Sequence, residues 1–272
     1  MNKTRIDWCD STVNPVVGCP NGCEWCYARR QNKRFHYVEN WEKPEFKPDV
    51  LKKFGSKKPR AVFIDSMSDI GCWRDEWLVE VLQTMANNPQ HDYIALTKTS
   101  LPALNKKIGA ALAKVDGDFD LYIGKSITTQ AQADAFRAEN EIIDFLSIEP
   151  ILEPIDLKDG AQMIHAIIIG AETGNRKGKV KPAADWVRDL VKQADGNEIR
   201  VFMKESLRSI MGAEFRQDPL PWRRIGKHGR RVFRCVAGAR CSILGSPPTS
   251  PSHLTCRRFW RRNRSRNTIC QQ

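Results

Sequence analysis

Short apolar runs alternate with longer amphipathic stretches along most of this 272-residue chain. The short runs are rich in Val, Ile and Phe and predict strands at 14–17, 61–65, 93–97, 121–127, 145–148, 166–169 and 200–203. Between several of them, apolar residues recur every three or four positions, which predicts helices that include 76–86, 131–140 and 184–194. Alternating strands and helices of this kind predict an α/β fold with a parallel sheet.

Charge divides the chain into two parts of very different composition. Residues 1–222 carry 31 Lys and Arg against 32 Asp and Glu, whereas residues 223–272 carry 13 Lys and Arg and no acidic residue. The overall net charge of +12 therefore describes the end of the chain and not its body. We expect a folded domain at 1–222 and a disordered, low-complexity basic tail at 223–272, which is either a shifted-frame end or an evolved module.

The composition does not suit a secreted or membrane protein. No apolar stretch approaches the roughly 18 residues of a membrane span, and residues 1–9 lack the apolar core of a signal peptide. Nine cysteines would suit a secreted disulfide scaffold, but the chain is long and its best cysteine cluster has the spacing of metal ligands. We therefore expect a cytoplasmic protein with reduced thiols and no membrane partner.

Three cysteines, Cys19, Cys23 and Cys26, form a CxxxCxxC motif. Three thiolates within eight residues can hold one compact centre, and their odd number leaves one corner of a four-metal cluster without a protein ligand. A structural zinc site would need a fourth ligand, and the only histidine nearby, His36, lies ten residues downstream, beyond the usual spacing. The spacing therefore favours an iron–sulfur cluster over zinc, and the polar turn at 20–22 disfavours three unconnected buried thiols.

The motif, with Trp25 before its last cysteine and Tyr27 after it, resembles the signature of the radical S-adenosylmethionine (SAM) superfamily. The resemblance implies a 4Fe–4S cluster on the three cysteines, with Trp25 in contact with the cofactors and SAM chelating the open iron. It also implies reductive cleavage of SAM to a 5′-deoxyadenosyl radical, which needs an electron donor such as a flavodoxin or ferredoxin. Six or seven strand–helix units without an eighth are similar to the partial (β/α) barrel of these enzymes, in which the cluster loop follows the first strand.

The predicted strand ends also resemble one narrower family, an uncharacterised phage-encoded group related to radical SAM proteins and known from mycobacteriophage gene products. The likeness spans residues 7–222 and is carried by the motifs at 14–15, 66–69, 96–98, 146–150, 169–174 and 202–204. In that order they read Asn-Pro, Ser-Met-Ser-Asp, Leu-Thr-Lys, Leu-Ser-Ile-Glu-Pro, Ile-Gly-Ala-Glu-Thr-Gly and Phe-Met-Lys. The family has no settled substrate, so the resemblance implies a fold and a cofactor but no particular reaction.

Functional residues of such barrels lie where strands end and loops begin. This rule selects two groups of side chains near the predicted strand ends. The candidate cofactor-binding residues, besides Trp25, are Ser66, Asp69, Ser126, Glu149 and Glu172, and the candidate catalytic residues are Cys72, Lys98 and Lys204.

Each candidate also has a purely structural interpretation. The two glutamates can form ion pairs with the two lysines across the barrel mouth. Ser66 can stabilise a turn, and Ser126 can cap the helix that begins near Thr128. Cys72 can donate a hydrogen atom in an active site or can be a small buried thiol.

Together these observations favour a radical SAM-type enzyme. A nucleic acid or nucleotide is the first choice of substrate because the resembled family is phage-encoded, and a peptide or small molecule is the second. The near-neutral body disfavours tight binding of duplex DNA, which needs several cations on phosphates. The alternative is a non-catalytic metal-binding or nucleic-acid-binding protein, in which the cysteines are structural and the basic tail binds. The chain has no Walker A motif (GxxxxGK followed by Ser or Thr), so nothing supports nucleotide hydrolysis.

Overall fold

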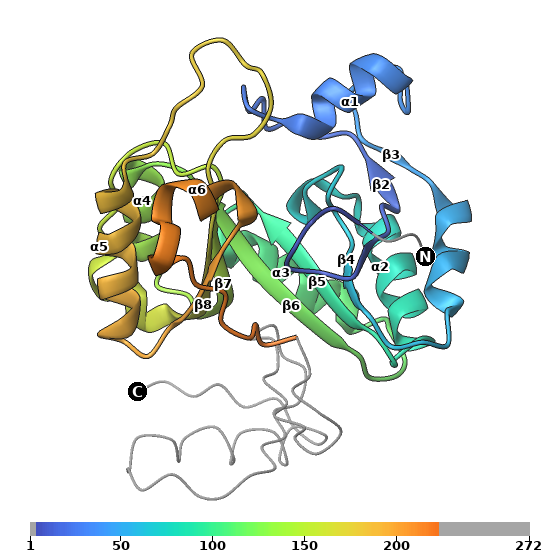
Figure 1. Ribbon diagram of the computed structural model, residues 1–272. Coiled ribbons are helices and arrows are strands. Elements are labelled where there is room, and N and C mark those ends of the chain that lie inside the picture. Colours follow the sequence, from blue (N-terminus) through green and yellow to red (C-terminus); the bar gives the residue numbers. More distant parts are fainter. Residues whose placement is uncertain (1–3, 223–272) are drawn as a thin grey trace, which may run out of the picture.

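The computed structural model describes residues 4–222, which fold around one curled parallel sheet (Figure 1). Seven strands lie in the order β1-β4-β5-β6-β7-β8-β9 and form an open half-barrel. Their bounds are β1 Ser11–Thr12, β4 Ala61–Phe63, β5 Asp92–Thr97, β6 Asp120–Ile127, β7 Ile143–Ile148, β8 Ile164–Ile169 and β9 Arg200–Met203. The predicted α/β half-barrel is confirmed, and the predicted tail at 223–272 lies outside the described residues.

Helices connect several of the parallel strands, as parallel pairing requires. Their bounds are α1 Tyr27–Phe35, α2 Asp75–Ala86, α3 Leu101–Leu112, α4 Gln130–Glu139, α5 Ala184–Asp195 and α6 Arg208–Met211. Short 3-10 helices span η1 Pro48–Gly55, η2 Ile70–Cys72, η3 Lys158–Met163, η4 Glu205–Leu207 and η5 Gly212–Glu214. None of the helices in residues 4–222 is long and apolar enough to cross a membrane.

The carboxyl ends of the strands meet at one edge of the half-barrel, which we call the rim. All neighbouring strands pair in parallel, so their carboxyl ends point the same way. In Figure 1 this edge faces α1 and the long loop that follows β8. The rim is therefore where a loop-borne site would be positioned by the sheet.

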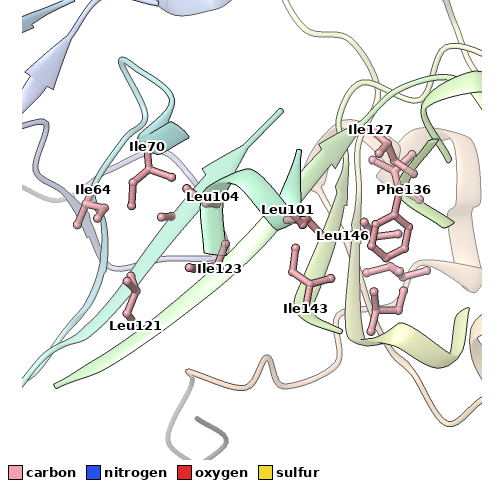
Figure 2. Packing of buried hydrophobic residues seen from close by; sticks show 14 of the residues in the cluster. Ile64, Ile70, Leu101, Leu104, Leu121, Ile123, Ile127, Phe136, Ile143 and Leu146 are labelled. Carbon is pink, nitrogen blue, oxygen red and sulfur yellow. The ribbon is translucent and has the colours of Figure 1, made fainter. Parts of the chain in front are cut away.

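The outer face of the sheet packs against the helices. Figure 2 shows part of this outer core, in which Leu101 and Leu104 of α3 and the sheet residues Ile123 and Leu146 are at most 4% exposed. Burying each such side chain contributes about 1.5–3 kcal/mol. Pro102 stands in the first turn of α3, where its missing N–H removes no helical hydrogen bond.

The inner face of the half-barrel is filled by aromatic side chains beneath the rim. We call Trp8, Phe63, Tyr122, Phe145, Phe202 and Trp222 the aromatic plug, and each is at most 5% exposed. The ring centroids of Phe145 and Trp222 lie 4.8 Å apart, and Trp222 Nε1 donates to Trp8 O over 2.8 Å. The plug therefore ties both ends of the described chain to the barrel interior.

The predicted strand ranges agree with the observed ones to within two residues, but the strand predicted at 14–17 does not belong to the half-barrel. The first strand of the half-barrel is Ser11–Thr12, whereas Val16–Val17 forms β2 and pairs antiparallel with β3, Glu45–Phe46, in a separate two-stranded sheet. Pro15 lies between them, and the chain leaves the main sheet there because proline has no N–H to donate to a ladder. The cysteine motif consequently lies between the two strands of this small ribbon and does not directly follow a strand of the half-barrel.

Candidate functional site

The rim is polar because the inward positions of the strands change character near their carboxyl ends. Side chains alternate between the two faces of a strand, so residues two or four positions after an inward aromatic also face inward. In β7, Phe145 belongs to the plug, and Ser147 and Glu149 follow it in the same phase. In the other strands the same spacing, counted from the inward residues Phe63, Ile94, Tyr122 and Phe202, places four residues at the rim. They are Asp65, Lys98, Ser126 and Lys204, in that order. The sheet thereby brings four of the predicted site residues to one edge: Lys98, Ser126, Glu149 and Lys204.

The cysteine loop, residues 18–26, is anchored to this edge through its first residues. Gly18 N donates to Met67 O over 3.0 Å, and Cys19 N donates to Trp41 O over 2.7 Å. Gly18 has a φ of +111°, and a Cβ there would lie 2.9 Å from Trp41 O. Only glycine combines this backbone conformation with so close an approach. The geometry of the loop thus requires a glycine directly before the first cysteine.

The loop runs directly into α1, and its last cysteine caps that helix. Cys26 Sγ accepts a hydrogen bond from Arg29 N over 3.3 Å, which satisfies one free N–H of the first turn. Arg29 Nη2 also donates to Cys23 O over 2.9 Å. Cys19, Cys23 and Cys26 are free, partly buried thiols, and the partly buried Trp25 lies between the last two. The start of α1 therefore holds two of the three thiols in one turn.

Asp69 links the cysteine loop to the strand ends. Its carboxylate accepts from Asn21 Nδ2 over 2.7 Å, and from Lys98 N and Thr97 Oγ1 over 2.8 Å each. Gly71 N donates a fourth bond over 2.9 Å. Hydrogen bonds to an ionised carboxylate are among the strong ones. Asp69 therefore positions the loop relative to the end of β5.

Ser66 stabilises the turn that precedes Asp69. Its Oγ donates to Asn14 Oδ1 over 2.9 Å, and Met67 N donates to the same oxygen over 3.1 Å. Tyr27 OH donates to Ser66 O over 2.8 Å, so α1 is tied to this turn as well. These contacts correspond to the structural interpretation of Ser66.

Lys98 brings a positive charge to the thiols. Its Nζ donates to Ser126 Oγ over 2.9 Å, while Thr129, not Ser126, caps α4. Burial lowers the pKa of Lys98, and the neighbouring Cys23 and Asp69 oppose that shift. Burial likewise raises the pKa of the Cys23 thiol, and Lys98 opposes that shift. The ammonium group and the thiolate thus stabilise each other's charged forms.

Cys72 lies beside the cysteine loop although it is distant from the motif in sequence. Its Sγ is 4.0 Å from Asn21 Oδ1, and its side chain is partly buried. Burial is the main cause that raises the pKa of Cys72 to about 11 and that of Cys19 to about 12, and the proximity of Cys72 contributes to the shift of Cys19. Cys72 is therefore a fourth thiol close to the motif.

Glu149 and Lys204 form an ion pair at another part of the rim. Lys204 Nζ lies 3.1 Å from Glu149 Oε2. A Cβ at Gly170, at the end of the intervening strand, would lie 3.0 Å from Lys204 Cδ and 3.3 Å from Glu149 Cγ, so the glycine makes room for the pair. Burial raises the pKa of Glu149, and Lys204 opposes this shift. Glu149 Oε1 is buried and makes no hydrogen bond of normal geometry within residues 4–222, and the equally unpaired Trp8 Nε1 is close enough to lower the pKa of Glu149.

Glu172 is engaged by its own loop. Its carboxylate accepts from Arg176 Nε over 2.6 Å and from Nη2 over 2.7 Å, and these bonds lower the pKa of Glu172. Arg176 Nη1 also lies 3.6 Å from Glu24 Oε2 in the cysteine loop. Neither predicted lysine partner pairs with Glu172 in the described part of the chain, so the predicted ion pair forms at Glu149 alone. Arg176 was not among the predicted site residues.

The donors at the rim suit an iron–sulfur cluster better than a closed zinc site. Three thiols from one short loop match the ligands of a cluster with one open iron. Within residues 4–222, no three His, Cys, Asp or Glu side chains, the motif cysteines included, are gathered as they would be around a single metal ion. Cys26 begins α1 and His36 ends it, so about 15 Å of helix separates the two. His36 is therefore too far away to complete a zinc site with Cys26.

Comparison with known proteins gives the chain a family. Residues 3–218 match the family model described as "Protein of unknown function (DUF5131)". The chain belongs to this family. The comparisons with curated proteins and with solved structures returned no significant match. The DUF5131 half-barrel is compatible with a radical SAM-like fold, and the predicted membership in an uncharacterised family is confirmed.

Proposed function

We propose that this DUF5131 protein is a radical SAM-type enzyme whose motif cysteines hold a 4Fe–4S cluster. One observation carries the proposal: the cysteine loop lies at the carboxyl-terminal rim of a parallel half-barrel, beside Asp69 and Lys98. Active sites of parallel barrels are built at this edge. The half-barrel thus supplies both the scaffold and the position that such an enzyme needs.

The chain's own side chains have distinct parts in this function. Cys19, Cys23 and Cys26 bind the cluster and leave one iron without a protein ligand. Once reduced by a flavodoxin or ferredoxin, a bound cluster supplies the electron that breaks the S–C5′ bond of SAM and yields methionine and a 5′-deoxyadenosyl radical. Lys98 stabilises the negative charge of the thiolates, and Trp25 adjoins the cofactors.

The rim residues offer several groups to SAM. Glu149 Oε1, which makes no hydrogen bond of normal geometry in the described chain, accepts from the SAM amino group or a ribose hydroxyl, while Lys204 holds the other carboxylate oxygen. Ser126 Oγ already accepts from Lys98 and has its own proton to donate to the ribose. In this proposal Cys72 returns a hydrogen atom from its thiol to a substrate radical, and the resulting thiyl radical regains an electron from the flavodoxin or ferredoxin and a proton from solvent.

The remaining candidates have positioning roles in this proposal. The hydrogen bonds of Asp69 and Ser66 hold the cysteine loop and its neighbouring turn. The carboxylate of Glu172 holds Arg176, which reaches the same loop. We retain a nucleic acid or nucleotide as the proposed substrate, with a peptide or small molecule as the second choice.

Iron loading and SAM cleavage test the proposal on the full-length protein. Purified without oxygen and reconstituted, the protein should bind about four irons per chain and release 5′-deoxyadenosine from SAM on reduction. Joint substitution of Cys19→Ala, Cys23→Ala and Cys26→Ala should abolish both. Cys9→Ala is the matched control, because Cys9 is a buried thiol beside the aromatic plug, and it should retain both. A complete cluster on the triple variant would overturn the assignment.

The alternative, a closed structural metal site, makes a different prediction for Cys72. If Cys72 were a fourth ligand, Cys72→Ala would release metal from the protein. In the proposed enzyme, Cys72→Ala keeps its iron and still cleaves SAM. Colourless protein with one zinc per chain, lost in Cys72→Ala, would support the structural alternative instead.

A further inference from the structure

Two segments beside the cysteine loop are strongly basic. They are α1 and the loop at 173–182, which together carry eight cations and no acidic residue: Arg29, Arg30, Lys33, Arg34, Arg176, Lys177, Lys179 and Lys181. Arg176 is paired with Glu172 and Glu24, so the other seven cations give the rim a local positive field in a body that is almost neutral as a whole. We call α1 and the loop at 173–182 together the basic arch.

The two segments of the basic arch lie side by side at the rim. A Cβ at Gly174 would lie 3.2 Å from Arg30 Nη2, which places the loop against α1. The ion pair of Arg176 with Glu24, at 3.6 Å, holds the same loop to the residues just before α1. Figure 1 shows both segments at this edge of the half-barrel. The arch therefore lies next to the three motif cysteines.

Exposed aromatic rings accompany these cations. Of the four large hydrophobic side chains that are exposed in residues 4–222, three belong to α1 or follow it closely: Tyr27, Phe35 and Tyr37. The Phe35 and Tyr37 ring centroids lie 5.7 Å apart, and Arg34 Cζ lies 5.0 Å from the Phe35 centroid. Two exposed rings beside a row of cations combine the two features that proteins use to bind single-stranded nucleic acid.

We propose that the basic arch binds single-stranded nucleic acid next to the cysteine loop. This inference rests on the proposed function and gives its substrate a class and a location. The cations neutralise phosphates, while Phe35 and Tyr37 stack on unpaired bases. A duplex offers no exposed base face to these rings, and an acidic peptide would engage the cations while leaving the rings without a partner.

Fluorescence anisotropy of a labelled oligothymidylate of roughly 15 nucleotides tests the charges of the arch. Lys33, Arg34, Lys177 and Lys181 are exposed, and the joint variant replaces each of them with Gln. Its affinity should fall at least about tenfold at moderate salt, and the slope of log affinity against log salt should become shallower by up to about 3. The matched control replaces Lys52, Lys53, Lys57 and Lys58, four exposed cations ahead of β4 and away from the rim, with Gln and should bind as the wild type does.

Joint substitution of Phe35→Ala and Tyr37→Ala tests the stacking. Base–aromatic stacking predicts at least about a fivefold loss of affinity, and the salt slope should stay unchanged because no charge is removed. A same-length duplex and a poly-glutamate peptide are measured in parallel and should bind more weakly than the single strand. Equal binding of the peptide, or unchanged affinity in both arch variants, would overturn the inference.

Photocrosslinking locates the bound strand independently of the basic tail, which all variants retain. A bromouracil-substituted oligonucleotide should crosslink to the peptide that contains Phe35 and Tyr37. Crosslinks confined to residues 223–272 would overturn the inference. The anisotropy and crosslinking measurements use full-length protein without cluster, so they do not depend on SAM cleavage. If binding depends on the arch but the protein does not cleave SAM, the proposed function alone is rejected. If the protein cleaves SAM but binding does not depend on the arch, the inference about the arch alone is rejected.

Discussion

The interior and the rim of the half-barrel are built from the same strands but hold opposite kinds of side chain. In β7, Phe145 is fully buried in the aromatic plug, and four residues later Glu149 forms an ion pair at the rim. In β9, the change from Phe202 to Lys204 takes two residues. Stability and chemistry are therefore separated along each strand. Substitutions in the interior should affect folding most, and substitutions at the rim should affect binding.

Phe145→Ala should give the largest loss of stability. Phe145 packs against Trp222 in a site without solvent access, and removing a buried phenyl ring costs about 3–5 kcal/mol of unfolding free energy. Ser126→Ala, at the rim four residues after Tyr122 of the plug, should cost about 1 kcal/mol, the worth of one hydrogen bond. Urea unfolding of the two variants measures the difference. Equal losses would contradict the separation of interior and rim.

On the opposite face of β7 from the plug, the buried Asp144 gives the stability a pH dependence. This carboxyl is buried in β7, and burial raises its pKa to about 7, although it accepts a bond from Ile123 N over 2.7 Å. An unfolded Asp has a pKa of about 3.9, so between about pH 4 and pH 7 the folded state binds a proton that the unfolded state has lost. The free energy of unfolding should therefore fall as the pH rises through this window, by up to about 4 kcal/mol.

Asp144→Asn tests this dependence, since it removes the titration and keeps the shape. Relative to wild type, the variant should gain unfolding free energy steadily between about pH 4 and pH 7. Urea unfolding across this range measures the gain, and Asp118→Asn, on an exposed loop, controls for the loss of one carboxylate. A constant difference between Asp144→Asn and wild type would show that Asp144 does not titrate in this window.

At the rim, Gly18→Ala should affect the cysteine loop more than the fold. The added Cβ would meet Trp41 O at 2.9 Å at a φ of +111°, so the loop would have to shift, at a local cost of about 1–3 kcal/mol. The variant should lose most of its iron after reconstitution, while its free energy of unfolding falls by no more than this local cost. Gly22→Ala is the matched control, because it also has a positive φ but no atom within 4 Å of the added Cβ. Equal iron loss in both variants would refute the steric argument.

The strands of the interior could be predicted because each is a continuous apolar run. The run that contains Ile167 and Ile168 forms β8, and both residues are fully buried. The two-residue strands could not be predicted, since Ser11–Thr12 and Glu45–Phe46 are too short to show any periodicity. Helix α1 was missed for a related reason: it buries only Ala28 and Asn32 and has no apolar stripe.

The candidate site could be predicted only as far as the strands position it. The phase of β7 and β9 places Glu149 and Lys204 together, and their ion pair was expected. Contacts between loops could not be predicted from sequence: the bond from Asn21 to Asp69 joins residues 48 positions apart, with no pattern to pair them. The functional roles of the rim residues, including the cluster ligands, stay predictions that the iron and SAM measurements decide.

Glu172→Gln should have the smallest effect on stability and so gives the finest test of the comparison. Glu172 and Arg176 connect a loop to the rim and not to the aromatic plug. The Glu172 side chain is only 2% exposed, but Gln still accepts a hydrogen bond from Arg176, so the substitution should remove only the charge assistance of that bond, about 1 kcal/mol. Urea unfolding should therefore change little, whereas amide exchange in the loop at 173–182 should become faster because Arg176 no longer holds it. Glu205→Gln, which removes another rim ion pair with Arg208, should leave exchange in that loop unchanged. If Glu172→Gln instead destabilised the protein as much as Phe145→Ala, the rim would stabilise the fold as strongly as the plug does, and the proposed division between them would be wrong.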